Sequence, residues 1–262
     1  MVLFWHECRQ NRKNLLIWAL CVGALCFGCL LLYSSLEESM EDMAGMFSEL
    51  GAFSMALGMD KINIGTLEGF YAIEIALMLS LGGALFAALT GSAICAKEEE
   101  GHTAEFINTL PVSRSSILVQ KYGAMVGVLV VFEVINILLI LAGFACMGGM
   151  PDMEKFALYH SVCFLMHLEI GSICFLLSAA MKKKPTGAAL GLSVFLYLAD
   201  LLCRVIPDLE KVKYITPYYY ANAADIFAEG SINPVMPGTG VVVSVLSFLL
   251  ALLIYNKRDI IV

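Results

Sequence analysis

Charge is scarce in this sequence. Only 15% of its 262 residues are charged, against about 25% in an ordinary soluble domain, and 60% are hydrophobic. The mean hydropathy is +0.82. The formal net charge of −7 argues against nucleic acid as a partner, because binding to nucleic acid depends on clustered lysine and arginine. The composition predicts a chain whose surface is largely covered by a lipid bilayer.

Several chemical signatures are also missing. The sequence has no GxxxxGK[ST] loop to cradle nucleotide phosphates and no HExxH metal motif. Among the nine cysteines, Cys26 and Cys29 have CxxC spacing and come nearest to a zinc or redox motif, but both fall in an uncharged apolar run, where cysteine behaves as a small hydrophobe. The first apolar run lacks the small-x-small exit of a cleaved signal peptide, so we expect a retained anchor. We therefore expect no catalytic residue, and no metal or cofactor bound by this chain.

Long apolar runs are what the sequence has instead. At about 1.5 Å per residue, about 20 residues of helix cross the hydrocarbon core of a bilayer. The runs predict a single all-α membrane domain over residues 1–262, with six spans at 15–33, 70–96, 117–147, 156–181, 186–206 and 241–255. Two longer polar segments, 34–69 and 207–240, separate spans on the outer side. The first of these has apolar residues at helical spacing, which predicts an amphipathic helix on the outer surface.

The distribution of lysine and arginine predicts the orientation. Four of the sixteen cations fall in the segments assigned to the outside, and Arg204 falls within a span. The other eleven fall in segments assigned to the cytoplasm: Arg9, Arg12, Lys13, Lys97, Arg114, Lys121, Lys182, Lys183, Lys184, Lys257 and Arg258. Because cytoplasmic loops carry the excess of cations, we expect both ends of the chain in the cytoplasm.

The segment 97–121 (KEEEGHTAEFINTLPVSRSSILVQK) is a highly polar stretch between two of the most apolar runs. It predicts a short helix that Gly101 and Thr103 open and Pro111 closes, with Glu105 in the first turn, where a carboxylate suits the positive end of a helix. Ser113 is placed to cap the long helix that follows. We predict a short cytoplasmic helix between the second and third spans, positioned so that another protein can push on it.

Four carboxylates fall inside the predicted spans, where a charge is costly. Asp200 lies four residues before Arg204 on one helical face, so this pair is interpreted as a structural ion pair. Glu133 and Glu169 fall near the middle of the third and fourth spans. Glu74 falls in the outer half of the second.

Two interpretations of the remaining acids stay open. They could line a translocation path, for which Glu133, Glu169, His167 and Glu74 are the candidates, or they could be protonated acids that hydrogen-bond between helices. His160 and His167 share one helical face and Glu169 is turned about 200° away from His167, so one helix cannot offer all three to a metal.

With this topology, three blocks resemble the membrane subunits of ABC-2 type transporter permeases. Residues 213–221 (KYITPYYYA) resemble a Pro-aromatic segment before the last span of that family, and 255–260 (YNKRDI) resemble its C-terminal ending. The third block resembles the family's loop between the second and third spans: Glu99, Glu100, Gly101, Thr103 and Glu105, then Pro111, Val112, Ser113, Arg114 and Lys121.

The resemblance implies the permease subunit of an ATP-driven transporter in a bacterial plasma membrane, moving cargo, in the direction of export, between two membrane halves. A separate ATP-binding subunit would bind ATP and Mg, and a second permease half, either a copy of this chain or a sibling, would complete the assembly. The segment between the second and third spans would be the coupling helix that receives the movement of the ATPase, through Glu99, Glu100, Gly101, Thr103, Glu105, Pro111 and Arg114.

Two functions from other classes remain open on the sequence. An ion-driven secondary carrier would use Glu133 and Glu169 as proton sites; it is commonly built from internal repeats, and no convincing repeat is present. A non-transporting membrane scaffold or immunity protein would need neither an ATPase nor a cargo path.

Overall fold

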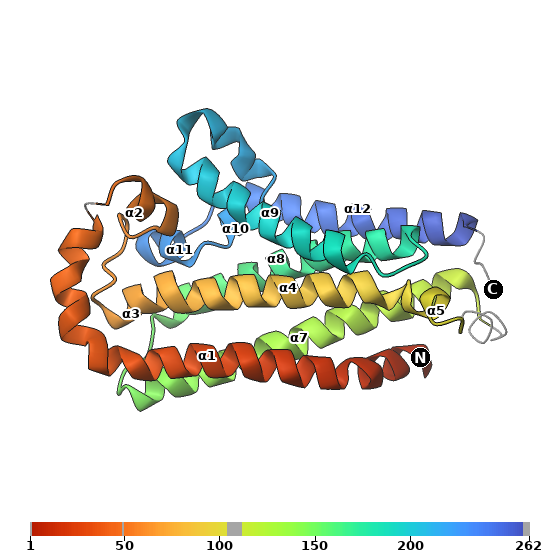
Figure 1. Cartoon of the computed structure of the whole chain (residues 1–262), viewed down its shortest axis with the longest axis horizontal. Coiled ribbons are helices and arrows are strands. Elements are labelled where there is room, and N and C mark those ends of the chain that lie inside the picture. The colour runs from red at the N-terminus through yellow and green to blue at the C-terminus, as the bar shows by residue number, and fades with distance from the viewer. Residues whose placement is uncertain (1, 49, 104–111, 259–262) are drawn as a thin grey trace.

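The computed structural model describes residues 2–48, 50–103 and 112–258. The described part contains helices and no strand, which confirms the predicted all-α fold. Within these described residues, six helical segments are long and apolar enough to cross a membrane (Figure 1): Val2–Glu37, Leu67–Ala93, Arg114–Cys146, Met153–Ala180, Thr186–Val205 and Val235–Lys257. The chain is therefore a multi-pass membrane protein. The last span begins earlier than the predicted residue 241, because the helix continues through Pro237.

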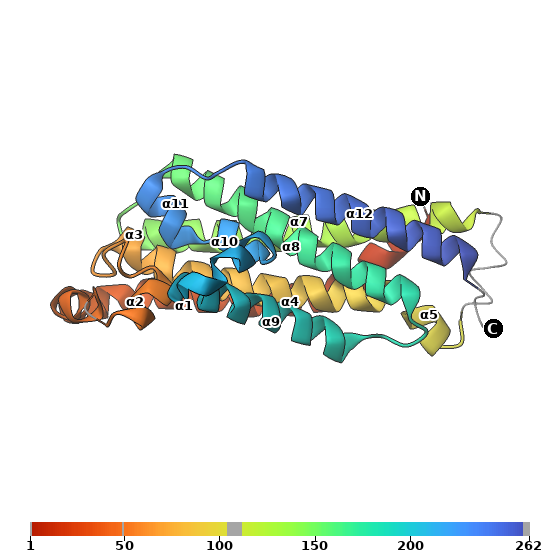
Figure 2. The same cartoon turned by 90° about the horizontal axis from the view of Figure 1, so that it is seen from above.

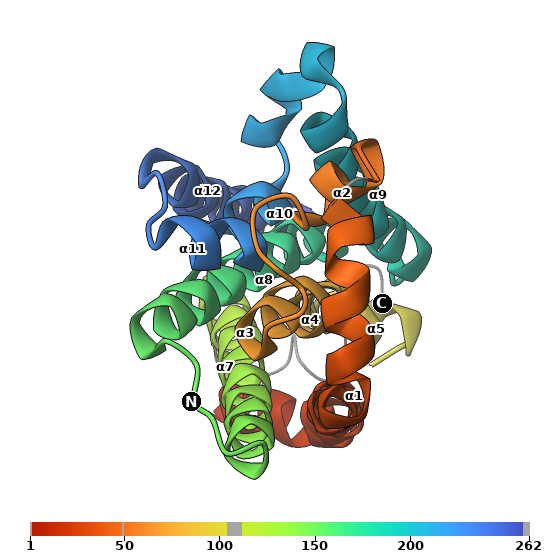
Figure 3. The ribbon, with the colours of Figure 1, turned by 90° about the vertical axis from the view of Figure 1, so that its left-hand side faces the viewer.

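Helix α1 (Val2–Ser48) corrects one prediction. The sequence pattern predicted a span over 15–33 and a separate surface helix after it, whereas α1 continues unbroken from Val2 to Ser48. It runs along the bundle and then bends, so that its last part crosses the far end (Figures 1 and 3). Tyr33 Oη donates to Gly65 O at 2.6 Å and fastens α1 to the loop before α3 (Leu67–Phe70).

The second span begins with an irregular stretch. Thr66 caps α3 by accepting a hydrogen bond from the Gly69 N–H at 3.0 Å. Only glycine fits at position 69, because a Cβ there would lie 1.8 Å from Asn63 O. A wide π-helical turn, η1 (Tyr71–Ile75), then joins α3 to α4 (Ala76–Ile94). Such turns often occur at functional sites, and this one places Tyr71 in the core with no exposed surface.

The other four spans are regular helices, and two of them begin at a side-chain cap. Ser113 Oγ accepts from Ser116 N at 3.2 Å at the start of α7 (Arg114–Cys146), as predicted. Asp152 caps α8 (Met153–Ala180). Helices α9 (Thr186–Val205) and α12 (Val235–Lys257) complete the bundle. Short helices α2 (Ala52–Leu57), η2 (Pro207–Tyr214), α10 (Pro217–Tyr220) and α11 (Ala223–Glu229) form a cap at one end (Figure 3).

Packing centres on α8, which lies against both α4 and α12 (Figure 2). Helix α1 packs along α7. Small residues allow the closest approaches: a Cβ on Gly83 would meet the His167 ring, and one on Gly91 would meet Gly171 O. The outward faces of α1, α7, α9 and α12 carry exposed large hydrophobic side chains, as expected for helices in contact with lipid.

The two ends of the bundle differ. Helix α5 (Lys97–Glu100) lies at the same end as the start of α1 and the end of α12, and we call it the α5 end (Figure 1). The opposite end, covered by α2, η2, α10 and α11, is the cap end. The start of α1 and the end of α12 therefore share one end of the bundle, as the predicted topology requires; the cytoplasmic assignment of that end stays a prediction.

Candidate functional site

Helix α5 is a single turn of four consecutive charged residues, and each side chain pairs with a different part of the bundle. Lys97 donates to Glu7 of α1. Glu98 accepts from Lys121 of α7 at 2.5 Å. Successive residues of a helix point about 100° apart, so one turn can reach partners on all sides.

The remaining two residues of this turn reach the other spans. Glu99 pairs with Arg258, directly after α12. Glu100 accepts from Lys184 N at 3.1 Å and lies 3.7 Å from Lys184 Nζ in the connection between α8 and α9. The single turn of α5 is thereby linked to α1, α7, α12 and the α8–α9 connection.

Lys121 is the centre of this network and has no exposed surface. Its ammonium group has three hydrogens, and three acceptors are in place: Glu7 Oε1 at 3.0 Å, Glu98 Oε1 at 2.5 Å and Ile94 O at 2.7 Å. Glu7, which is 1% exposed, bridges Lys121 and Lys97. The two lysines and two glutamates cancel in charge, as buried ions require.

Arg258 makes hydrogen bonds at the ends of several helices. Its Nη1 donates to Ala179 O at 2.8 Å and to Met181 O at 3.0 Å, where α8 ends. Arg114 at the start of α7 donates to Arg258 O at 2.8 Å. The pair with Glu99 therefore connects α5 to the ends of three spans.

A second polar network lies in the middle of the bundle, around Glu133 of α7. His160 Nδ1 is 2.6 Å from Glu133 Oε1, and Tyr71 Oη is 3.1 Å from His160 Nε2. His167 Nδ1 lies 3.5 Å from Glu133 Oε2, while its Nε2 donates to Ser80 O at 3.1 Å. This network joins α7 and α8 to η1 and α4, and all its side chains are buried.

Glu169 faces the other side of α8. Tyr220 Oη donates to Glu169 Oε2 at 2.8 Å. A Cβ on Gly240 would lie 2.7 Å from Tyr220 Oη and 2.8 Å from Glu169 Oε2, so glycine lets α12 close over this pair. Glu133 and Glu169 thus belong to two separate contacts on opposite faces of α8. Glu74, in η1, is half-buried.

A third network ties the cap to α9. Arg204 Nε donates to Asp200 Oδ2 at 3.0 Å, and Arg204 Nη1 donates to Asp225 Oδ2 at 2.8 Å. Lys61 Nζ pairs with Asp225 Oδ1 at 2.7 Å. Burial alone would raise the pKa of Asp225, but Arg204 and Lys61 hold that pKa below its usual range.

Comparison with known proteins decides the family. The family model described as ABC-2 family transporter protein matches residues 1–260. The chain belongs to the ABC-2 family of transporter proteins. No curated protein matches it significantly.

Most of the coupling residues suggested by the family pattern lie at the α5 end. Glu99 and Arg114 point into the ion-pair network, whereas Glu100, with 42% of its side chain exposed, remains accessible. Gly101 lies at the end of α5, and its N–H donates to Lys97 O at 2.9 Å. Thr103 N donates to Glu98 O at 2.8 Å and folds the chain back over this turn. Glu105, Pro111 and the greater part of the predicted coupling helix lie outside the described residues.

The predicted neighbours Asp200 and Arg204 lie together in this ABC-2 family member, and their purely structural role stays a prediction.

Sequence reasoning missed Glu7 and the position of Lys121 at the centre of the ion-pair network. A signal for Glu7 was present: Leu3, four residues before it, lies on the same helical face, and both side chains are buried. An acid on the apolar face of a helix needs a buried cation as its partner.

Proposed function

We propose that this chain is the permease subunit of an ATP-driven transporter, and that a separate ATP-binding subunit moves it through α5. The observation that carries the proposal is the pairing of four consecutive side chains, Lys97 to Glu100, with four different parts of the bundle. A displacement of this one turn pulls on α1, α7, α12 and the α8–α9 connection together.

The partner-facing surface consists of the exposed residues beside this turn. Glu100, Gly101, His102 and Thr103 are exposed on one side, and Val112 and Ser113 on the other. Glu98 and Glu99 face the bundle and serve to pass the movement inward. Membrane subunits of this family work with an ATP-binding subunit, which supplies the site for ATP and Mg.

The complete transporter contains two permease halves, formed by a second copy of this chain or by a sibling. Its halves rock between states as the partner binds and hydrolyses ATP, and cargo leaves the cell between them. The membrane is the bacterial plasma membrane, with α5 on the cytoplasmic side. In this arrangement Glu133, His160 and His167 hold α7 to α8 within one half.

The test is purification of the tagged chain from its own membranes, followed by measurement of ATP hydrolysis in the complex. We expect a nucleotide-binding subunit to co-purify. Gly101→Pro removes the N–H that donates to Lys97 O and disfavours helical geometry at Glu100, so coupling should be lost. Glu100→Ala should weaken it. Glu154→Ala, at an exposed glutamate where α8 begins, is the matched control.

Two outcomes would contradict the proposal. One is solute flux driven by a proton gradient with no ATP-binding subunit present. The other is unchanged ATP hydrolysis and transport in both α5 variants.

A further inference from the structure

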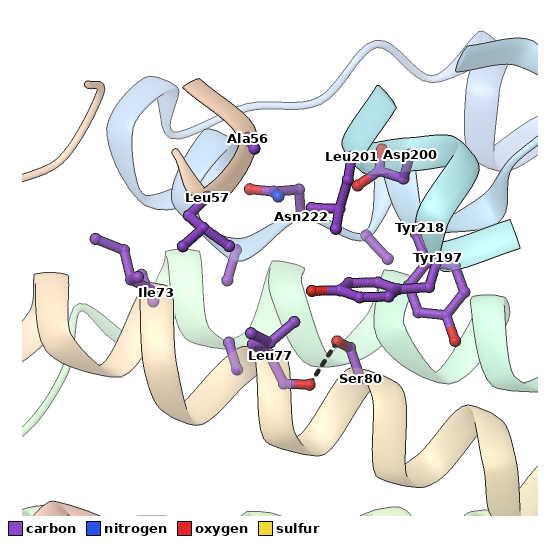
Figure 4. A pocket seen from close by; sticks show the side chains of 14 residues that line it. Ala56, Leu57, Ile73, Leu77, Ser80, Tyr197, Asp200, Leu201, Tyr218 and Asn222 are labelled. Carbon is purple, nitrogen blue, oxygen red and sulfur yellow. Dashed lines mark hydrogen bonds between the residues drawn. The ribbon is translucent and has the colours of Figure 1, made fainter. Parts of the chain in front are cut away.

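A small cavity opens between α4, α9 and the cap (Figure 4). Its volume is about 40 Å³, and its polar wall includes Ser80, Tyr197, Asp200, Tyr218 and Asn222. Figure 4 shows Asp200 and the two tyrosines on one side, and Leu57 and Ile73 on the other. This volume holds a group of about three water-sized atoms.

One oxygen atom of the cavity wall, Oδ1 of Asp200, indicates that the cavity holds a ligand. Asp200 is 3% exposed, and its Oδ2 accepts from Arg204 Nε. Its Oδ1 is buried and accepts no hydrogen bond from any residue that the structure describes. A buried carboxylate oxygen without a donor is unfavourable, so a donor is expected on the cavity side.

Charge decides which kind of donor fits. Asp200 and Asp225 are already balanced by Arg204 and Lys61. An ammonium group would add an uncompensated buried cation, and an anion would meet the Asp200 carboxylate. An uncharged hydroxyl or amide N–H satisfies Oδ1 without changing the net charge.

The rest of the wall supports an amphipathic ligand. Asn222 Oδ1 accepts from Asp225 N at 3.1 Å, which leaves the amide NH₂ of Asn222 as the group that can donate. Leu57, Leu77 and Leu201 line the cavity and are half-buried, so an apolar chain can extend along them towards the surface.

We propose that this cavity binds the uncharged polar head, a hydroxyl or an amide, of an amphipathic molecule. The head donates to Asp200 Oδ1, and the apolar remainder lies along the leucines. This assignment rests on the proposed function in one respect, because it takes the ligand to be the cargo.

The test uses the full chain in lipid nanodiscs, without any partner, and four probes that differ only in their head: 1-hexanol, hexanamide, hexylammonium and hexanoate. Saturation-transfer NMR, with empty nanodiscs as reference, measures binding. We expect the alcohol and the amide to bind at least about tenfold more tightly than the two ions, since only they satisfy the carboxylate without adding charge.

Variants locate the binding. Ala76→Leu adds side-chain volume at the cavity wall and should abolish binding of the alcohol and the amide, whereas Ala188→Leu, at an exposed alanine of α9, should not. Asp200→Asn should weaken binding at least about tenfold. Because this substitution also disturbs Arg204, Ala76→Leu, which fills the cavity, is the decisive variant.

Equal binding of all four probes, no binding, or binding unaffected by Ala76→Leu would overturn the site. Because no ATPase is used, these results are independent of the proposed function. If the alcohol and the amide bind here as predicted and the purified complex does not couple ATP hydrolysis to transport, the proposed function fails and the binding site stands.

Discussion

Replacing Lys121 with methionine tests the α5 network most severely. Methionine keeps the volume of the lysine stem but removes the ammonium group, and with it the donors to Glu7, Glu98 and Ile94 O. Lys97 remains beside Glu7. The carboxylate left without a cation is therefore Glu98, whose side chain is 13% exposed.

The size of the effect follows from burial. Breaking a buried ion pair by removing one partner destabilises a protein by about 3–5 kcal/mol, mainly because the other charge is left unpaired. Limited water access to Glu98 places the expected loss near the lower limit, at about 3 kcal/mol. The double variant Lys121→Met with Glu98→Gln removes the unpaired charge, so about 1–2 kcal/mol of the loss should be recovered.

The assay is equilibrium unfolding in mixed micelles, followed by tryptophan fluorescence. Lys183→Met, at an exposed lysine of the same end, is the control and should change the free energy of unfolding by less than about 0.5 kcal/mol. A loss below about 1 kcal/mol for Lys121→Met, or no recovery in the double variant, would refute the reasoning about this cluster.

Two further predictions concern packing and pH. Gly83→Ala would place a Cβ 2.2 Å from the His167 ring and should destabilise the fold by about 1–3 kcal/mol. Gly187→Ala, with open space around it, should be neutral or slightly stabilising. Thermal unfolding of both variants tests this difference. The lowered pKa of Asp225 means that its ion pairs contribute stability at neutral pH and lose it as the pH falls below about 4, and Asp225→Asn should remove this pH dependence of unfolding; an unchanged acid transition in the variant would contradict the assignment.

The spans could be predicted from sequence because lipid imposes a simple requirement, a long apolar helix, on each of them. The point at which α1 ends could not be predicted in this way. Ser35 and Glu38 form a pattern typical of a helix start, but no proline interrupts Val2–Ser48, and the helix continues through the pattern. A capping pattern starts a helix only where the backbone has already left helical geometry.

Whether an ion pair could be predicted from the sequence depended on how far apart its partners lie along the chain. Asp200 and Arg204 are four residues apart on one helix, so helical periodicity alone places them together. Glu7 and Lys121 are separated by 114 residues, and Glu99 and Arg258 by 159. No periodicity links such positions. The family pattern indicated the segment, and only the structure showed where its side chains point.

The central claim is that α5 receives movement from an ATP-binding partner. Its most direct test is a photo-crosslinking amino acid at the exposed His102, installed in the full chain in its own membranes, with mass spectrometry of the product. The account predicts a crosslink to a protein that carries a GxxxxGK[ST] loop, with a yield that changes when ATP is added. A yield no higher than with the same group at Lys211 of the cap end, or transport by the chain with no such partner, would contradict it.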